Sequence, residues 1–244
     1  MRKISYGAIL ALAVSLLVFP MTSTAQRLKE GSKVGIGVKV STLGAGVEAA
    51  IPVFGRLNFR GGFNAMSYSH AFHQDGVPYN GSLSLRSAEA SLDWFPFGEF
   101  HVSPGLLLYN GNKITATTVV AGGQSITLND FTYTSDPKSP LNGSGNVVFW
   151  KAAPKLTVGW GDLIPRSGRR WSFLGEVGIA YQGTPRASLA FQGNVCNSSG
   201  LNCVNAATDP TVQANITGEQ GKISYNLYPL RFYPIVSVGF GFNF

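Results

Sequence analysis

Hydroxyl, imidazole and carboxylate side chains gather between residues 67 and 75, a combination that can support nucleophilic catalysis. The set comprises Ser67, Ser69, His70, His73 and Asp75. A serine nucleophile needs a histidine base within hydrogen-bond reach and a carboxylate that orients the base. Ser69 and His70 are adjacent in a segment with strand character, so their side chains diverge to opposite faces. We therefore expect a polar patch beside a loop, with no catalytic residue and no enzymatic activity.

A second group of chemically active side chains is spread along the chain but follows one rule of spacing. Eight charged residues stand opposite large apolar residues, so in strands they would share one face: Lys39, Glu48, Arg60, Glu89, Asp93, Lys151, Lys155 and Glu176. Such charges can pair with one another, or they can line a polar path in which Lys151 and Lys155 favour anions. We expect them to face the interior of the fold and mainly to fill it.

Eight runs of alternating apolar and polar residues would position these charges. In the clearest run, residues 236–244, the large side chains of Val236, Val238, Phe240, Phe242 and Phe244 alternate with small or polar ones. The other runs span residues 34–40, 45–53, 57–65, 88–94, 101–109, 148–160 and 171–181, the last of which could continue through Arg186. Each run presents one apolar face, because strand side chains alternate between two faces. The pattern predicts an all-β fold, a single eight-stranded antiparallel up-and-down transmembrane β-barrel.

The connections between these runs differ in length on the two sides. Residues 54–56, 97–100 and 162–170 form short turns, whereas residues 71–81, 111–146 and 193–230 form long loops. Apart from a tight turn near Ser41, this is the arrangement of barrels with short periplasmic turns and long extracellular loops. Within the first large loop we expect a hairpin of residues 113–120 and 125–133. Residues 208–228 are weakly helical at best, and the pattern leaves helix and loop open.

Aromatic residues give an independent test of a membrane position, because Trp and Tyr favour the interface between lipid and water. On the assigned strands, one aromatic girdle lies at the short-turn end and contains Trp94, Trp160 and Trp171, together with Phe54, Phe97, Phe100 and Phe244. Tyr68, Tyr109, Trp150 and Tyr181 lie towards the long loops. The core aromatics of a soluble exported β-sandwich, the competing interpretation, would not separate by end.

The N-terminal segment has the features of an export signal. Two basic residues precede an apolar run at residues 7–19, and a polar stretch ends at Ala25. A positive start, a short apolar run and small residues before the cleavage site define a secretory signal peptide. An anchoring helix would need about 20 apolar residues, more than this run offers. We expect residues 1–25 to be removed and residues 26–244 to form one barrel domain.

Two cysteines, Cys196 and Cys203, lie in a polar segment. Cysteines of exported proteins commonly oxidise, so we expect one disulfide that closes a small loop. Metal binding would need further ligands, and the three histidines, His70, His73 and His101, lie far away in the sequence. We therefore expect neither a metal nor a cofactor.

The composition bounds the partners of the chain. Only 13% of the residues are charged, 30 residues are glycine and 12% are aromatic, which suits strands that face lipid on one side. The formal net charge is +7, but basic residues cluster only at Arg166, Arg169 and Arg170. An exported chain without a larger basic patch is not expected to bind nucleic acid.

Taken together, these features resemble the small outer-membrane β-barrel proteins of the broad OmpA/OmpW-like, Gram-negative type. The likeness covers residues 33–244 and rests on the alternating runs, the Phe-Arg-Gly-Gly segment at 59–62 and the ending that contains Phe240, Phe242 and Phe244. It implies that these three phenylalanines form a C-terminal assembly signal for the barrel-assembly machinery during biogenesis. It also implies a multi-pass position in the lipid of the cell outer membrane. No peptidoglycan-binding domain follows the last run, so the tethering role of two-domain relatives is not expected.

The leading hypothesis is a non-enzymatic integral outer-membrane protein whose loops at residues 111–146 and 193–230 carry a structural or surface-interaction role. The alternative is a narrow passive channel for small solutes. A third hypothesis, a lipid-modifying enzyme, would depend on His70 or His73. Architecture alone does not choose among such roles, and the pattern identifies no surface ligand.

Overall fold

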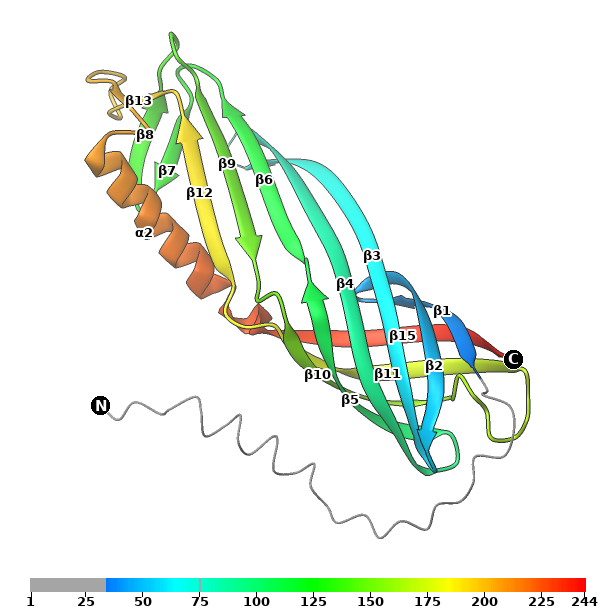
Figure 1. The fold of residues 1–244 in the computed structure, drawn as a ribbon. Coiled ribbons are helices and arrows are strands. Elements are labelled where there is room, and N and C mark those ends of the chain that lie inside the picture. The colour runs from blue at the N-terminus through cyan, green and yellow to red at the C-terminus, as the bar shows by residue number, and fades with distance from the viewer. Residues whose placement is uncertain (1–33, 75) are drawn as a thin grey trace, which may run out of the picture. The chain divides into compact units, whose positions relative to one another are not determined.

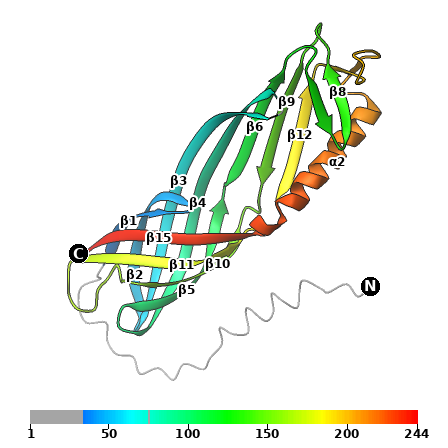
Figure 2. The ribbon, with the colours of Figure 1, turned by 180° about the vertical axis from the view of Figure 1, so that it is seen from behind.

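Strands make up most of the fold of residues 34–74 and 76–244, the part of the chain that the computed structural model describes (Figures 1 and 2). The main sheet contains β1 (Gly35–Ser41), β2 (Gly44–Phe54), β3 (Leu57–Gln74), β4 (Val77–Phe97), β5 (Phe100–Asn110), β6 (Lys113–Val120), β9 (Leu141–Val148), β10 (Ala153–Trp160), β11 (Trp171–Tyr181), β12 (Arg186–Gln192) and β15 (Phe232–Asn243). A second sheet contains β7 (Ser125–Leu128), β8 (Phe131–Ser135), β13 (Asn194–Cys196) and β14 (Val204–Asn205). The predicted signal peptide, residues 1–25, lies outside the described residues.

Eight strands of the main sheet pair in a ring. The antiparallel order is β1–β2–β3–β4–β5–β10–β11–β15, and β15 returns to β1 with Phe240 opposite Val38. These strands correspond to the eight alternating runs, although residue 148 belongs to β9 and β10 begins only at Ala153. The ring is not evenly closed, because the β4–β5 pair shifts register twice. We call the end with the short turns the lower end and the opposite end the upper end.

The main sheet continues beyond the ring, so the prediction of a single eight-stranded barrel is only partly right. The upper part of β4 leaves β5 and pairs with β6 instead, with Tyr79 opposite Thr118. β9 and β12 extend the sheet beyond β6, which brings it to eleven strands (Figure 1). An unpaired strand edge exposes backbone N–H and C=O groups. The three added strands continue the hydrogen-bonded ladder along the upper part of β4, where β5 no longer reaches.

The predicted hairpin of residues 113–120 and 125–133 is wrong. β6 pairs with β4 and β9, whereas β7 pairs with β8 around Asn129 and Asp130. These two residues have φ values of 50° and 69°, the left-handed conformation that two-residue hairpin turns require and that Asn and Asp tolerate. The chain also turns at residues 121–124, where Gln124 N donates to Ala121 O at 3.0 Å, but that turn joins strands of two different sheets. The possible continuation of the seventh run is also wrong, because Arg186 begins β12, which pairs with β9.

The segment left open between helix and loop contains the helix α2 (Pro210–Asn226), followed by the short 3-10 helix η1 (Tyr228–Arg231). The Asp209 side chain caps α2 by accepting hydrogen bonds from the backbone N–H groups of Thr211 and Val212, each at 3.0 Å. Pro210 suits the first turn, where no N–H is needed. No helix among the described residues is long and apolar enough to cross a membrane.

The second sheet and α2 together cover the inner face of the upper strands, and we call these elements the cap. Val212 and Ile216 of α2 share a buried core with Val120 of β6 and Leu128 of β7. Figure 1 shows α2 alongside β12, with β7 and β8 beside them. The glycine at position 218 allows this close approach, because a Cβ atom there would lie 2.5 Å from Asn129 Cγ. The two large loops of the sequence thus form one packed unit.

Candidate functional site

The outer face of the ring is apolar and exposed. On β1, Ile36, Val38 and Val40 point outward, and Val38 keeps 59% of its surface accessible. Phe173 of β11 and Val238 of β15 are exposed by 78% and 65%. Proteins in water rarely leave a continuous apolar face of this kind uncovered. The alternation of the sequence therefore places large apolar side chains on the outside of the ring.

The aromatic residues of the predicted lower girdle lie on this outer face. Trp94, Trp160 and Trp171 are about half exposed and stand at the lower ends of β4, β10 and β11. The ring of Trp171 lies 5.0 Å from that of Phe240 and 4.7 Å from that of Phe242, measured between centroids. The aromatic residues of the C-terminal strand, including Phe244, thus join the same belt.

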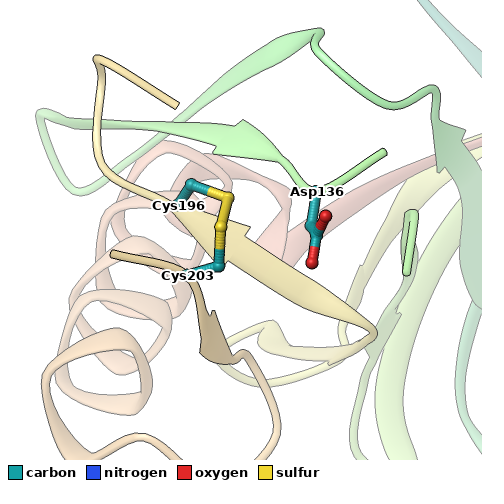
Figure 3. Close-up of side chains that lie close together, drawn as sticks. All are labelled: Asp136, Cys196 and Cys203. Carbon is teal, nitrogen blue, oxygen red and sulfur yellow. A yellow bond between two sulfur atoms is a disulfide. The ribbon is translucent and has the colours of Figure 1, made fainter. Parts of the chain in front are cut away.

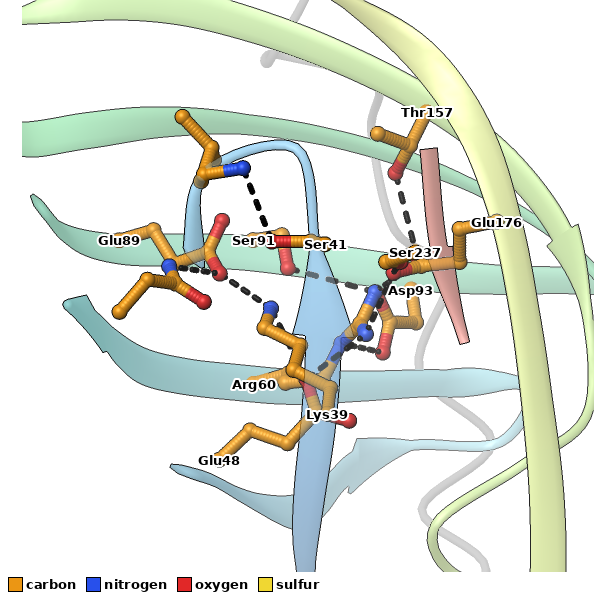
Figure 4. Close-up of polar contacts among 12 residues, drawn as sticks. Lys39, Ser41, Glu48, Arg60, Glu89, Ser91, Asp93, Thr157, Glu176 and Ser237 are labelled. Carbon is orange, nitrogen blue, oxygen red and sulfur yellow. Dashed lines mark hydrogen bonds and ion pairs between the residues drawn. The ribbon is translucent and has the colours of Figure 1, made fainter. Parts of the chain in front are cut away.

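The inner face of the ring carries a connected network of buried charges, drawn in Figure 4. Arg60 of β3 lies at its centre and is 3% exposed. Its guanidinium donates to Glu48 (3.2 Å), to Asp93 (3.0 Å) and to Glu176 (3.0 Å). Three carboxylates from three different strands therefore share one cation.

The same network continues towards β4 and β10. Lys39 Nζ lies 3.2 Å from Glu48 Oε2 and also pairs with Glu89. Lys155 pairs with the other oxygen of Glu89, and Asn64 donates to Glu89 Oε1 at 3.1 Å. Glu89 is thus held by two ammonium groups and an amide. Buried charges are tolerated only when they are paired and hydrogen-bonded, and this network meets that condition.

Glycine residues on the inner face leave the space that these long side chains occupy. A Cβ atom at position 159 would lie 2.8 Å from His101 Nε2 and from Glu176 Cγ. One at position 105 would lie 3.0 Å from Lys155 Cε. The high glycine content of the strands therefore has a packing role inside the ring.

Apolar clusters close the interior above and below the charges. At the lower end, Leu163 and Ile164 of the 161–170 turn pack with Ala50 and Leu174. The upper cluster combines residues from β5, β10, β11, β15 and the β1–β2 turn: Leu43, Leu107, Ala153, Ala180 and Ile235. The remaining space among the charges themselves cannot hold a water molecule. Side chains therefore fill the interior at these three levels.

The structure brings together seven of the eight charged residues named from the sequence: Lys39, Glu48, Arg60, Glu89, Asp93, Lys155 and Glu176. Lys151 does not join them, which corrects its placement on the inner face. It is exposed and precedes β10, so the alternation of a strand does not govern its orientation. His101 is the member that the sequence interpretation missed, and its Nε2 lies 3.1 Å from Glu176 Oε1. His101 and Ser103 are two positions apart in β5, so they share a face, and both are buried. This alternation is the sequence signal that could have placed His101 on the inner face.

A buried carboxyl at the lower end has an altered acidity. Asp162 follows β10 and is 2% exposed. It accepts hydrogen bonds from Asn58 Nδ2 (2.9 Å) and Ile164 N (2.8 Å), and it pairs with Arg166 at 2.9 Å. These donors favour the ionised form, but burial outweighs them and raises the pKa of Asp162 from 3.8 to about 6.

The serine and histidine residues between 67 and 75 lie on the exposed part of β3. Ser67, Ser69, His70 and His73 are all exposed, and Ser69 Oγ donates to Ser82 Oγ of β4 at 3.1 Å. The ring of His70 stacks on that of Tyr68, at 6.3 Å between centroids. The hydroxyl of Ser69 is therefore directed at its cross-strand neighbour.

The predicted disulfide is confirmed, since Cys196 is bonded to Cys203. Asp136 lies close to both sulfur atoms, as Figure 3 shows. A carboxylate beside two thiolates could hold a metal ion. Because each sulfur is bonded to the other, neither is available as a thiolate ligand here. The bridge ties β13 to the segment that precedes β14, within the cap.

Comparison with known proteins gives results for structure but not for sequence. The chain matches no protein-family model and no curated protein sequence. Among solved structures it is similar to CarO2 of Acinetobacter baumannii, with a TM-score of 0.55 and 20% identity, over 87% of this chain and 99% of that chain. It is also similar to CarO of Acinetobacter baumannii, with a TM-score of 0.52 and 20% identity, over 85% of this chain and 96% of that chain. These neighbours are outer-membrane proteins. The chain has the fold of an outer-membrane β-barrel.

Proposed function

We propose that this chain is a non-enzymatic integral protein of the outer membrane, with a structural or surface-interaction role carried by the cap. The observation that supports this proposal is the separation of the two faces of the ring. Outward positions are apolar and exposed, whereas the charges of the same strands are buried in a filled interior. A charged side chain facing lipid near the midplane would cost about 2–4 kcal/mol, so this arrangement suits a lipid environment.

The filled interior favours this role over a passive channel. A solute path needs continuous space, but the charges of the ring are paired and apolar clusters lie above and below them. Lys155, one of the two lysines expected to favour anions, is engaged by Glu89. Lys151, the other, is exposed outside the network.

The exposed position of Ser67, Ser69, His70 and His73 favours a non-enzymatic role. A catalytic serine requires a base that accepts its proton, whereas the Ser69 hydroxyl donates to Ser82. Outer-membrane lipid and, during biogenesis, the barrel-assembly machinery are the partners proposed for the ring. The cap is proposed to face the outside of the cell, where it would meet any surface ligand.

The membrane proposal is tested on the mature chain, purified after export and folded in detergent. Boiled and unboiled samples are compared by gel electrophoresis, and far-ultraviolet circular dichroism is recorded with and without detergent. We expect heat-dependent migration and a strong β signal in detergent only. A chain that folds in plain buffer would instead be an exported water-soluble β protein, and the proposal would be wrong.

The choice between a filled barrel and a channel is tested by conductance in planar lipid bilayers. We expect no steady single-channel conductance from the wild-type chain. A conductance that disappears in the Lys155→Ala variant would establish the channel instead. Lipid turnover that depends on His70 or His73 would establish an enzyme.

A further inference from the structure

The cap encloses a cavity of about 480 Å³ above the ring. One wall is the inner face of β4, β6, β9 and β12, and the other is β7. Sites for small molecules in proteins typically measure about 300–1,000 Å³, so the size is suitable. The cavity is separate from the charged interior, with which it shares no lining residue.

Glycine residues form the floor of this cavity. Pairing across the four strands aligns two rows of residues: Tyr79, Thr118, Gly143 and Phe191 in one, and Gly81, Ala116, Gly145 and Leu189 in the other. The central strand, β9, therefore has no side chain in either row. A Cβ atom at Gly143 would lie 2.6 Å from Phe191 Cε1, and one at Gly145 would lie 2.8 Å from Leu189 Cδ2. Glycine inside a strand lowers its stability and often marks a place where a ligand approaches the backbone.

The opposite wall is held in place by the rest of the cap. Leu128 of β7 is buried in the same core as Val212 and Ile216 of α2. At the tip of the β7–β8 hairpin, Asn129 N donates to Glu219 Oε2 of α2 at 2.9 Å. Contacts with α2, which is distant in the sequence, therefore hold β7 over the glycine floor. Contacts within the cap therefore shape the cavity, and a preformed site lowers the entropic cost of binding.

The lining of the cavity defines the chemistry of its occupant. None of the described residues that line it carries a charge. Aromatic and aliphatic side chains, among them Tyr79, Ile126 and Phe191, supply most of the surface. The hydroxyl groups of Ser125 and Thr127 are exposed and bond to those of Thr134 and Thr132 on β8, at 3.3 Å each. A charged ligand would lose its hydration here without gaining a counter-charge. A neutral ligand with a largely apolar body would match this surface.

We infer that the cap is a binding site for a small, neutral, largely apolar molecule. The ligand lies between the glycine floor of β9 and the apolar side of β7. Phe191 and Tyr79 flank its apolar body. This inference goes beyond the proposed function and does not depend on whether the ring conducts solutes.

The test uses a neutral aromatic alcohol that carries a photoreactive diazirine, applied to the folded chain in phosphatidylcholine vesicles. Peptide mass spectrometry locates the label after irradiation. We expect saturable labelling of the strand segments that contain Tyr79, Ile126 or Phe191, with competition by the same alcohol lacking the diazirine. Labelling that is found only on the outer belt, or that does not saturate, would overturn the inference.

Two variants of β9 provide the matched comparison. Gly145→Leu fills the cavity from its floor, whereas Asn146→Leu adds the same side chain to the exposed opposite face of the strand. We expect Gly145→Leu to lower the apparent affinity about 5- to 140-fold, which corresponds to crowding of about 1–3 kcal/mol in the filled site. Asn146→Leu should label like the wild type. Equal labelling of both variants would contradict the proposed site.

Folding and ligand charge are controlled separately. Heat-dependent migration on a gel verifies that each variant folds, and Ala116→Leu replaces Gly145→Leu if the latter does not fold.

The charge of the ligand is tested with a carboxylate analogue of the probe. It should compete at least about tenfold more weakly, because the lining offers no counter-charge. Equal competition would overturn the neutral class of ligand. Loss of labelling in a chain that still folds as a barrel counts against this inference alone, whereas failure to form the barrel counts against the proposed function.

Discussion

Arg60 and Glu176 lie on opposite sides of the ring and are joined by a hydrogen bond through its interior. Arg60 Nη1 of β3 donates to Glu176 Oε2 of β11 at 3.0 Å, although 116 positions separate the two residues in the sequence. Four steps of strand pairing separate β3 from β11 in either direction around the ring. The pair therefore forms a crossbar through the interior of the barrel.

Replacing the arginine of this crossbar should be severely destabilising. Arg60→Met leaves Glu48, Asp93 and Glu176 without their shared cation, and removal of one partner from a buried charge cluster costs about 3–5 kcal/mol. The free energy of unfolding in lipid vesicles, measured by urea titration, provides the check. Arg169→Met removes an exposed arginine that pairs with Glu99 and is the control, with a change of about 0–1 kcal/mol. Similar values for the two variants would contradict a structural role for the crossbar.

Two glycines that are almost neighbours across a strand pair should respond differently to the same substitution. Gly159 faces the charges, and an added methyl group would crowd His101 and Glu176. Gly175, on the adjoining strand, has no atom within 4 Å of such a group. We expect Gly159→Ala to lose about 1–3 kcal/mol of unfolding free energy. Gly175→Ala should stay within about 0.5 kcal/mol of the wild type. Vesicle-based unfolding measures both, and equal losses would refute the packing role of Gly159.

The carboxyl of Asp162 should titrate near neutral pH. Burial raises its pKa from 3.8 to about 6, so the folded chain holds this proton more tightly than the unfolded chain. Its contribution to stability is therefore greatest below pH 3.8 and falls as the pH rises through about 6. Carbon-13 NMR of labelled aspartate follows the titration, and Asp162→Asn identifies the signal. Arg166→Gln removes a cation that favours the ionised form and should raise the midpoint further. A midpoint at the ordinary value would show that the site is open to water.

Loss of the disulfide should loosen the cap without affecting the ring. For a loop with a sequence separation of 7 residues, the chain-entropy account assigns the bridge about 2–3 kcal/mol. In the Cys196→Ser/Cys203→Ser variant, hydrogen exchange should accelerate in β13 and α2, which pack together in the cap. Exchange in β1, β2 and β15 serves as the internal control and should not change. Equal acceleration in both regions would show that the cap and the ring unfold together.

Much of the ring could be predicted from the sequence because alternation is a local property of a strand. Lys39 lies between Val38 and Val40, and one choice of face for the valines fixes the direction of the lysine. The same rule failed at Lys151, which lies outside any strand. It could not reveal the upper sheet, because the partner of a strand depends on distant residues: Thr118 could pair with many segments, and only the fold places it opposite Tyr79.

The helix and the cavity were harder to predict for a different reason. Gly218 and Gly221 weaken the helical pattern of residues 210–226, while the capping by Asp209 and Pro210 favours it. Packing of Val212 and Ile216 against the cap decides between them. The glycines of β9 carry no local sign that two walls will enclose them. The sequence therefore predicts the faces of the ring better than it predicts the site in the cap.

The long segment between β5 and β10 has a consequence for how this architecture can vary. β5 and β10 pair as neighbours although roughly 40 residues separate them, and loop-closure entropy grows only with the logarithm of loop length. Compared with a four-residue turn, that length costs only about 2 kcal/mol, which the strands built within it can offset. The upper end can therefore accept insertions, deletions and new surfaces while the paired strands and the crossbar of the ring stay unchanged.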